Sequence, residues 1–216
     1  VLVGKKDAYE FPTFLRHCYH LLRAYNPEVE LELVALLAPS VPLPDEETQA
    51  LFTKRELVYQ IADCEDFAAA RNSMLSLSTG DWILRLDVDE RLTLNVTYLI
   101  SRLGNFPDST HAIRVARANR LHGHIADINA FVEKHKWTID ENGRVNWPDR
   151  QFVLFRRRPD IYWVNAQHET LCQVTGSVLE FPGDSLYIDH YKSVAMQERQ
   201  LSAEQALKAR IEQQAP

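Results

Sequence analysis

The first half of the chain alternates short apolar runs with amphipathic stretches. The apolar runs predict β-strands over residues 1–3, 31–37, 56–61, 82–86 and 112–116. The stretches between them predict helices over residues 11–25, 45–52, 63–79 and 94–103. Strands that alternate with helices in this way favour a doubly wound sheet. We therefore expect an α/β fold in which helices flank a mostly parallel central sheet.

Local signals define several of these helix ends. Pro12 suits a first helical turn, and Asn26-Pro27 ends the helix that follows it. Asp45 is a candidate N-cap. Gly80 suits the left-handed residue that closes a helix before the strand at 82–86.

The second half of the chain has short apolar runs without long amphipathic stretches between them. These runs predict strands over residues 151–156, 161–164, 171–174 and 186–188. The tail from Val194 to about Gln213 is rich in Ala, Gln, Glu and Leu, which predicts a helix. We expect one domain over residues 1–192, more irregular after about residue 117, and a helical tail over residues 193–216.

The composition is that of an ordinary globular domain, with 45% hydrophobic and 25% charged residues among 216. The net charge of −6 argues against a general nucleic-acid binder. No apolar run approaches the roughly 18 residues that a transmembrane helix needs. The three cysteines are an odd and widely spaced set, which predicts no disulfide framework and favours a reducing cytoplasm.

Two carboxylates, Asp87 and Asp89, follow the strand at 82–86. The carboxyl end of a strand is where an open α/β sheet binds its ligands. Acids one residue apart repel each other, and a divalent cation bound to a phosphorylated ligand would relieve that repulsion. The simpler interpretation is a helix-capping Asp beside a surface acid.

Other short motifs accompany this acidic pair. They are Ala70-Arg71-Asn72, Gly80-Asp81-Trp82-Ile83-Leu84, Leu86-Asp87-Val88-Asp89-Glu90, Asp149-Arg150-Gln151 with Leu154-Phe155-Arg156, Gln167-His168-Glu169 and Asp189-His190-Tyr191. In order and separation they resemble the family-2 inverting glycosyltransferases of the GT-A fold. The resemblance covers residues 1 to about 192. It implies a GT-A-type domain with a nucleotide-binding half over about 1–117 and an acceptor-side half over about 118–192.

The resemblance implies that one sugar is transferred from a nucleotide-sugar donor with inversion. Asp89 would bind Mn²⁺ or Mg²⁺, His190 would complete the metal site, and Asp87 would contact the donor ribose or a metal-bound water. Glu169 would be the catalytic base that takes the proton of the acceptor. His168 stands where the family usually has an acid, so this assignment can shift by one residue.

The remaining predicted contacts concern the donor and the acceptor. The resemblance places Arg71 and Asn72 at the donor sugar or its diphosphate, where a guanidinium can bind two oxygens. Val3, Gly4, Asp63 and Val88 would contribute to nucleotide binding, and Trp147, Asp149, Arg150 and His168 to acceptor binding. The chain departs from the family at Leu37-Ala38-Pro39-Ser40, where the family has an Asp pair followed by Gly-Ser. A carboxylate that often contacts the base is therefore missing.

Several alternatives remain beside this interpretation. His168-Glu169 does not begin a metalloprotease H-E-x-x-H motif, because Cys172 occupies the position of the second His. A non-catalytic nucleotide- or sugar-binding module on the same scaffold is the main rival. Arginine clusters at 156–158 and at 114, 117 and 120 would suit a polyanionic acceptor, although most such clusters are solvated. The tail could pack on the domain, form a homodimer or lie at a membrane surface.

Overall fold

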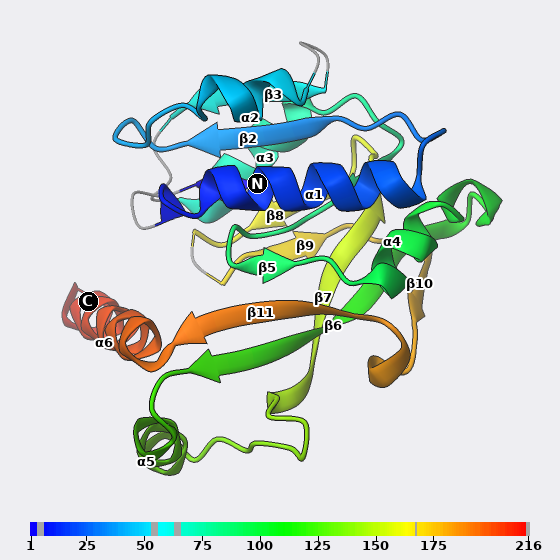
Figure 1. The fold of residues 1–216 in the computed structure, drawn as a ribbon. Coiled ribbons are helices and arrows are strands. Elements are labelled where there is room, and N and C mark those ends of the chain that lie inside the picture. The colour runs from blue at the N-terminus through cyan, green and yellow to red at the C-terminus, as the bar shows by residue number, and fades with distance from the viewer. Residues whose placement is uncertain (4–6, 53–55, 63–65, 167, 215–216) are drawn as a thin grey trace.

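A small parallel sheet forms one layer of the molecule. We analysed a computed structural model, which describes residues 1–3, 7–52, 56–62, 66–166 and 168–214, without the side chains of residues 203, 204 and 207–214. The sheet contains β1 (Leu2–Val3), β2 (Leu33–Leu37) and β3 (Leu57–Ile61) in the order β1-β2-β3, with both pairs parallel. Helices α1 (Phe11–Tyr25) and α3 (Phe67–Leu77) lie beside this sheet, as Figure 1 shows.

The predicted signals explain most of the helices in this half. In α1, Pro12 lies in the first turn, and the N–H of Asn26 donates to the carbonyl of Leu22 at the end of the helix. The side chain of Asp45 accepts a hydrogen bond from Thr48 N and so caps α2 (Glu46–Ala50). Asp66 caps α3 in the same way. The prediction for Gly80 was wrong, because α3 ends at Leu77 and Gly80 does not have a left-handed φ.

A six-stranded mixed sheet forms the larger layer. Its strands are β4 (Trp82–Leu84), β5 (Glu90–Arg91), β6 (Thr110–His122), β7 (Val145–Arg156), β10 (Ser177–Glu180) and β11 (Tyr187–Ser193). The order is β4-β7-β6-β11-β5, and β10 pairs with the first part of β6. β6 is parallel to β10 and β11 but antiparallel to β7, and β4–β7 and β5–β11 are also antiparallel.

The prediction of a mostly parallel central sheet therefore holds for β1-β2-β3 and is wrong for the larger sheet. β6 and β7 run antiparallel although a helix lies between them in the sequence, because that helix lies beyond the end of β6 and does not cross the face of the sheet (Figure 1). The expected irregularity after residue 117 is also limited. β6 and β7 are long strands of 13 and 12 residues, although their pairing has two register shifts, and helix α5 (Ile125–His135) was not predicted. The α/β class itself is confirmed.

The shorter elements complete the two layers. They are α4 (Leu94–Ile100), the 3₁₀ helices η2 (Leu103–Asn105) and η3 (Gly183–Ser185), and a separate hairpin of β8 (Tyr162–Val164) and β9 (Thr170–Cys172). β6 and β11 extend beyond the body and lead into α5 and α6 (Val194–Gln214), which are joined by an ion pair between Lys134 and Glu198 (Figure 1). No helix among the described residues is long and apolar enough to cross a membrane.

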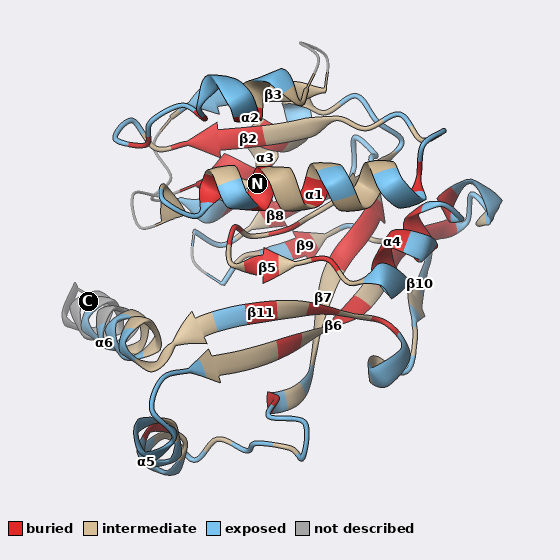
Figure 2. Ribbon diagram, in the orientation of Figure 1, coloured by how far each residue is buried: buried red, intermediate tan, exposed pale blue. Residues whose placement is uncertain are grey.

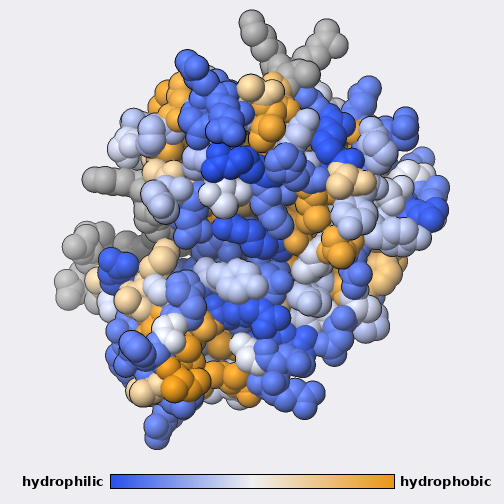
Figure 3. Space-filling model, viewed as in Figure 1, coloured by the Kyte–Doolittle hydropathy of each residue, from blue (hydrophilic) through white to orange (hydrophobic). Residues whose placement is uncertain are grey.

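The hydrophobic core lies between the two layers. Fully buried side chains such as Phe14 and Leu15 of α1, Leu37 of β2 and Ile188 of β11 belong to one cluster, and Figure 2 shows the buried positions concentrated in this region. A cavity of about 1270 Å³ is lined by residues of α1, β2, α3 and β4, among them Arg71. The face in Figure 3 carries a band of hydrophilic side chains across its middle, where β5 lies in Figure 1.

Candidate active site

A guanidinium joins two of the predicted site residues. Arg71, on α3, donates from Nε to Glu169 Oε1 at 2.6 Å and from Nη2 to Asp87 Oδ1 at 3.0 Å. Its side chain is only 5% exposed and stacks over the Trp163 ring. Three segments that are far apart in the sequence therefore meet at the guanidinium of Arg71. The guanidinium fixes the positions of both carboxylates.

The turn between β4 and β5 shapes the position of Asp87. Glu90 N donates to the carbonyl of Asp87, and the Glu90 carboxylate accepts from Asp87 N at 2.8 Å. Burial raises the pKa of Asp87, but the charges of Arg71 and Arg85 outweigh burial and hold that pKa well below its usual range. Asp87 therefore carries its charge at neutral pH.

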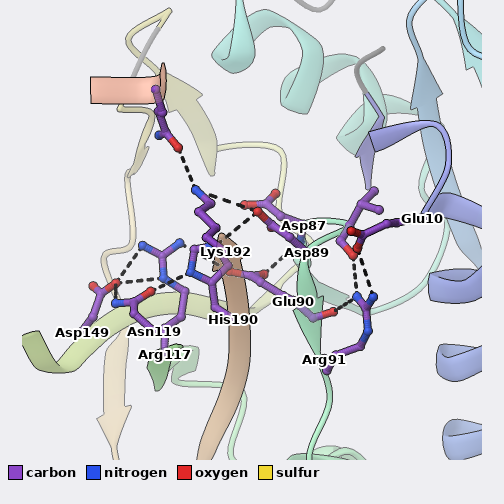
Figure 4. Close-up of polar contacts among 12 residues, drawn as sticks. Glu10, Asp87, Asp89, Glu90, Arg91, Arg117, Asn119, Asp149, His190 and Lys192 are labelled. Carbon is purple, nitrogen blue, oxygen red and sulfur yellow. Dashed lines mark hydrogen bonds and ion pairs between the residues drawn. The ribbon is translucent and has the colours of Figure 1, made fainter. Parts of the chain in front are cut away.

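A row of polar side chains crosses the larger sheet beside this turn. The strand register places Asp149 of β7 opposite Arg117 of β6, and His190 of β11 between Asn119 of β6 and Glu90 of β5. Because side chains two apart on a strand share a face, Arg117 and Asn119 point the same way. Figure 4 shows these residues converging near Asp89.

Asp89 lies directly against the ring of His190. The backbone carbonyl of Asp89 accepts from Tyr191 N at 3.1 Å, which fastens the turn to β11. Asp89 Oδ2 is 3.3 Å from His190 Nε2 and 3.9 Å from Lys192 Nζ. Burial raises the pKa of Asp89, but the contacts with His190 and Lys192 outweigh burial and keep that pKa below its ordinary value.

Asn119 determines which nitrogen of His190 carries a proton. The Asn119 amide donates from Nδ2 to Asp149 Oδ2 at 3.1 Å, so its oxygen must face His190. Asn119 Oδ1 is 2.6 Å from His190 Nδ1, and an oxygen acceptor at that distance requires a proton on Nδ1. In neutral His190 the lone pair of Nε2 therefore points toward Asp89, and the contact with His190 that lowers the pKa of Asp89 forms only when Nε2 is protonated as well. A ligating histidine held through its other nitrogen is typical of metal sites.

We predict that neutral His190 in the metal-free protein carries its proton on Nδ1, the tautomer that free histidine disfavours. Two-bond ¹H–¹⁵N correlation spectra distinguish the two tautomers directly. Asn119→Leu removes the acceptor and should restore the Nε2-protonated form. A wild-type spectrum with the proton on Nε2 would contradict this assignment. His190→Gln identifies the resonance.

Asp89 and His190 fit a pair of neighbouring metal ligands. Ligands at ~2.1 Å from an octahedral ion and at right angles are about 3.0 Å apart, close to the 3.3 Å between Asp89 Oδ2 and His190 Nε2. Within the described part of the chain, no group of three or more His, Cys, Asp or Glu side chains is arranged to hold a metal. The remaining positions of an ion at this pair would thus fall to ligand oxygens and water.

Two further residues of the site, Arg85 and Asn119, were not predicted from the sequence, and Arg117 was named only as part of an arginine cluster. Arg85 is 9% exposed and lies 3.3 Å from Asp87 Oδ2 and 3.6 Å from the fully buried Glu90. Arg117 binds Asp149 Oδ2 with Nε at 2.8 Å, and Asn119 lies beside it. Two sequence signals for these residues were available. One is the presence of an Arg within the apolar run 82–86, and the other is the alternation of small and polar residues in Ala116-Arg117-Ala118-Asn119.

Charge in this site is nearly balanced among the described residues. Burial raises the pKa of Glu90, although Arg85 and Arg117 are close to it. Burial also raises the pKa of Asp149, but Arg117 and the hydrogen bonds from Asn119 and Gln151 outweigh burial and lower that pKa overall. The cationic side chains are Arg71, Arg85, Arg117 and Lys192, and the carboxylates are Asp87, Asp89, Glu90, Asp149 and Glu169.

Some predicted donor contacts lie apart from this cluster. Both ends of the Asn72 amide are used by the backbone of Trp163, with Nδ2 donating at 2.9 Å and Oδ1 accepting at 2.8 Å, so Asn72 fastens α3 to β8. Val3 and Val88 are buried in the core. Gly4 and Asp63 lie outside the described residues.

The predicted acceptor contacts divide in a similar way. Asp149 belongs to the polar row, whereas Arg150, the next residue on β7, donates to Phe181 O at 2.8 Å beside β10. Trp147 packs under the guanidinium of Arg144, which is 3.8 Å from the ring centroid. His168 is exposed and has a left-handed φ of 53°. The acceptor-binding roles remain predictions.

Comparison with known proteins shows a partial similarity. No family model matches the chain. The chain is 37% identical over 106 residues to a TPR repeat-containing protein of Synechococcus elongatus. The match covers 49% of this chain and 21% of that protein, so the chain spans about a fifth of the relative's length. Tetratricopeptide repeats are helix pairs, whereas the described part of this chain combines sheets and helices.

Proposed function

We propose that this chain is a metal-dependent inverting glycosyltransferase with a GT-A-type fold, which transfers a sugar from a nucleotide-sugar donor to an acceptor. The observation that carries the proposal is the meeting of Arg71, Asp87 and Glu169 at one guanidinium, next to the Asp89–His190 pair. These residues come from separate segments, and each was selected from the sequence for a role in one reaction.

The side chains divide the work of the proposed reaction. Glu169 takes the proton of the acceptor hydroxyl as that oxygen attacks the anomeric carbon from the face opposite the leaving group. Arg71 holds both Glu169 and Asp87 in position. Asp89 and His190 would hold Mn²⁺ or Mg²⁺, with Asn119 orienting the imidazole. A divalent ion bound there supplies positive charge to the departing diphosphate.

The charge balance of the site supports metal dependence. The carboxylates slightly outnumber the cationic side chains, so a diphosphate anion alone would enter a site without an excess of positive charge. A divalent cation that arrives with the donor corrects this deficit. Without a metal ion, the charge of Asp87 is compensated by its ion pairs with Arg71 and Arg85.

The same contacts favour a second candidate, a nucleotide- or sugar-binding module without catalysis. Glu169 Oε1 is engaged by both Nε and Nη2 of Arg71, so the proposed base is already paired. The two candidates differ in one result, since only the transferase loses its function when Glu169 is neutralised.

The described arginine clusters do not favour a polyanionic acceptor over others. Arg114 pairs with Glu180, Arg120 with Asp189 and Arg158 with Asp160. Arg156 donates to the carbonyls of Thr110 and Phe106. These guanidiniums already have partners within the chain, and the acceptor class therefore stays open.

The proposal predicts metal-dependent binding of a nucleoside diphosphate. In a thermal-shift panel of UDP, GDP, CDP, ADP and dTDP, at least one should raise the Tm in the presence of Mn²⁺ and have little effect in EDTA. A ligand that binds only the native state stabilises it by about 2.7 kcal/mol at 100 times its Kd. The paired control is Asp89→Asn, which should remove the metal-dependent part of the shift. Absence of any metal-dependent shift would contradict the donor site.

A further inference from the structure

Lys192 lies beside the Asp89–His190 pair and is anchored by the C-terminal helix. It follows His190 by two positions on β11, so both side chains point to the same face of the sheet. Its Nζ donates to Gln200 Oε1 of α6 at 2.8 Å and is 3.9 Å from Asp89 Oδ2. The side chain is only 15% exposed. Figure 4 shows Lys192, Asp89 and His190 directed toward one another.

This ammonium is badly placed for a site that binds only a cation. The oxygen it approaches, Asp89 Oδ2, is the same atom that faces His190 Nε2 at 3.3 Å. A divalent ion held by Asp89 and His190 would therefore lie close to a positive charge that is sheltered from water. Like charges at such separations repel strongly when solvent screening is reduced. An anion that contacts both the metal and the ammonium removes the conflict.

We infer that Lys192 binds a phosphate oxygen of a diphosphate ligand, and that Gln200 of α6 positions its ammonium for this contact. The inference rests on the proposed function and extends it. It names Lys192 as the residue that contacts the diphosphate, and it gives the C-terminal helix the role of positioning that lysine. Diphosphate is the chemistry that fits, because its oxygens can contact a divalent ion and an ammonium together.

The inference predicts effects of opposite sign in one variant. Lys192→Met should bind Mn²⁺ alone about tenfold more tightly than the wild type, because it lacks the repelling charge. With Mn²⁺ present, the same variant should bind pyrophosphate and nucleoside diphosphates about tenfold more weakly, because one charge-assisted contact is lost. A lysine that only supported the fold would weaken both or change neither.

Mn²⁺ binding can be followed by the electron paramagnetic resonance signal of the free ion, and pyrophosphate binding by calorimetry at fixed Mn²⁺. Arg158→Met is the matched control for net charge, because within the described residues Arg158 does not contact α6 or the polar row and its side chain is 40% exposed. It should change neither affinity. Lys192→Arg keeps the charge and should retain most of the pyrophosphate affinity.

The role of α6 has its own pair of variants. Gln200→Leu removes the acceptor that holds Lys192 and should weaken pyrophosphate binding in the same direction as Lys192→Met, but less. Gln205→Leu, at an exposed position of the same helix, should have no effect.

The outcomes separate this inference from the proposed function. If pyrophosphate binding depends on Lys192 but no nucleoside diphosphate binds, the anion site stands and the transferase assignment fails. If nucleoside diphosphates bind with metal and Lys192→Met changes neither Mn²⁺ nor pyrophosphate affinity, the transferase proposal stands and the inference is overturned. Changes of the same sign in both affinities, or no binding of Mn²⁺ or pyrophosphate by the wild type, also overturn it.

Discussion

Glu169→Gln is expected to lower the rate of sugar transfer by about 10²–10⁴-fold, the usual contribution of a general base. Glutamine keeps the size of the side chain and an oxygen that can accept from Arg71 Nε, a bond that is 2.6 Å long in the present protein. It cannot take a proton from the acceptor. The affinity for the nucleoside diphosphate should therefore be nearly unchanged, which separates loss of chemistry from loss of binding. Single-turnover transfer assays and calorimetry measure the two quantities.

The matched control for this substitution is Glu180→Gln. Glu180 also pairs with an arginine, Arg114, but it lies on β10 outside the polar row and is 41% exposed. Its substitution should leave the transfer rate intact. Full transfer activity in Glu169→Gln would assign the base elsewhere, with His168 the first residue to test. Retained ligand binding in a wild-type protein without transfer would favour the binding module.

Arg71→Leu should lower the free energy of unfolding by about 3 kcal/mol, near the lower end for breaking a buried ion pair. The guanidinium is 5% exposed and serves Asp87 and Glu169 together, so its removal leaves two carboxylates without their partner. We expect a decrease at the lower end of that range because the side chain of Asp87 is 30% exposed and water can still solvate its charge. Urea unfolding of both proteins gives the difference.

A double-mutant cycle tests the cause of this loss. Combining Arg71→Leu with Glu169→Gln should cost less than the sum of the single changes, because the neutral amide no longer needs the guanidinium. Arg158→Leu is the exposed reference, since Arg158 and Asp160 are 40% and 43% exposed, and it should cost less than about 1 kcal/mol. If Arg71→Leu lowered the free energy of unfolding no more than Arg158→Leu does, the buried contacts of Arg71 would contribute little to stability.

Local sequence signals predicted the first half of the fold well. The spacing of apolar residues and the flanking Pro12 and Asn26 located α1, and the apolar run at 31–37 located β2. The same signals were overlooked or weak in the second half. In α5 the apolar residues Ile125, Ile128, Phe131 and Val132 have helical spacing, yet the helix was not predicted, and only Phe131 is buried. The outer half of β6 carries small and charged residues, which hid its true length.

The site could be predicted only in part. The acidic pair and the separate residues Arg71, Glu169 and His190 were each recognised from short motifs, and the structure places them together, although their roles stay predictions. Their partners were missed, because Asn119 acquires its importance only through the register of β6 with β11. Strand pairing between residues about seventy positions apart has no local signal in a single sequence.

The position of β11 has a consequence for how the protein is made. β11 separates β5 from β6, yet it follows all other strands in the sequence. A nascent chain on the ribosome thus exposes β5 and β6 with unpaired edges until residues 187–193 emerge, and Asp89 has no imidazole beside it. Truncation before Tyr187 would remove His190 and Lys192 from the site and leave Arg71, Asp87 and Glu169 in the chain. β11 is therefore the last strand to pair in the larger sheet, and the contact between Asp89 and His190 forms only at that step.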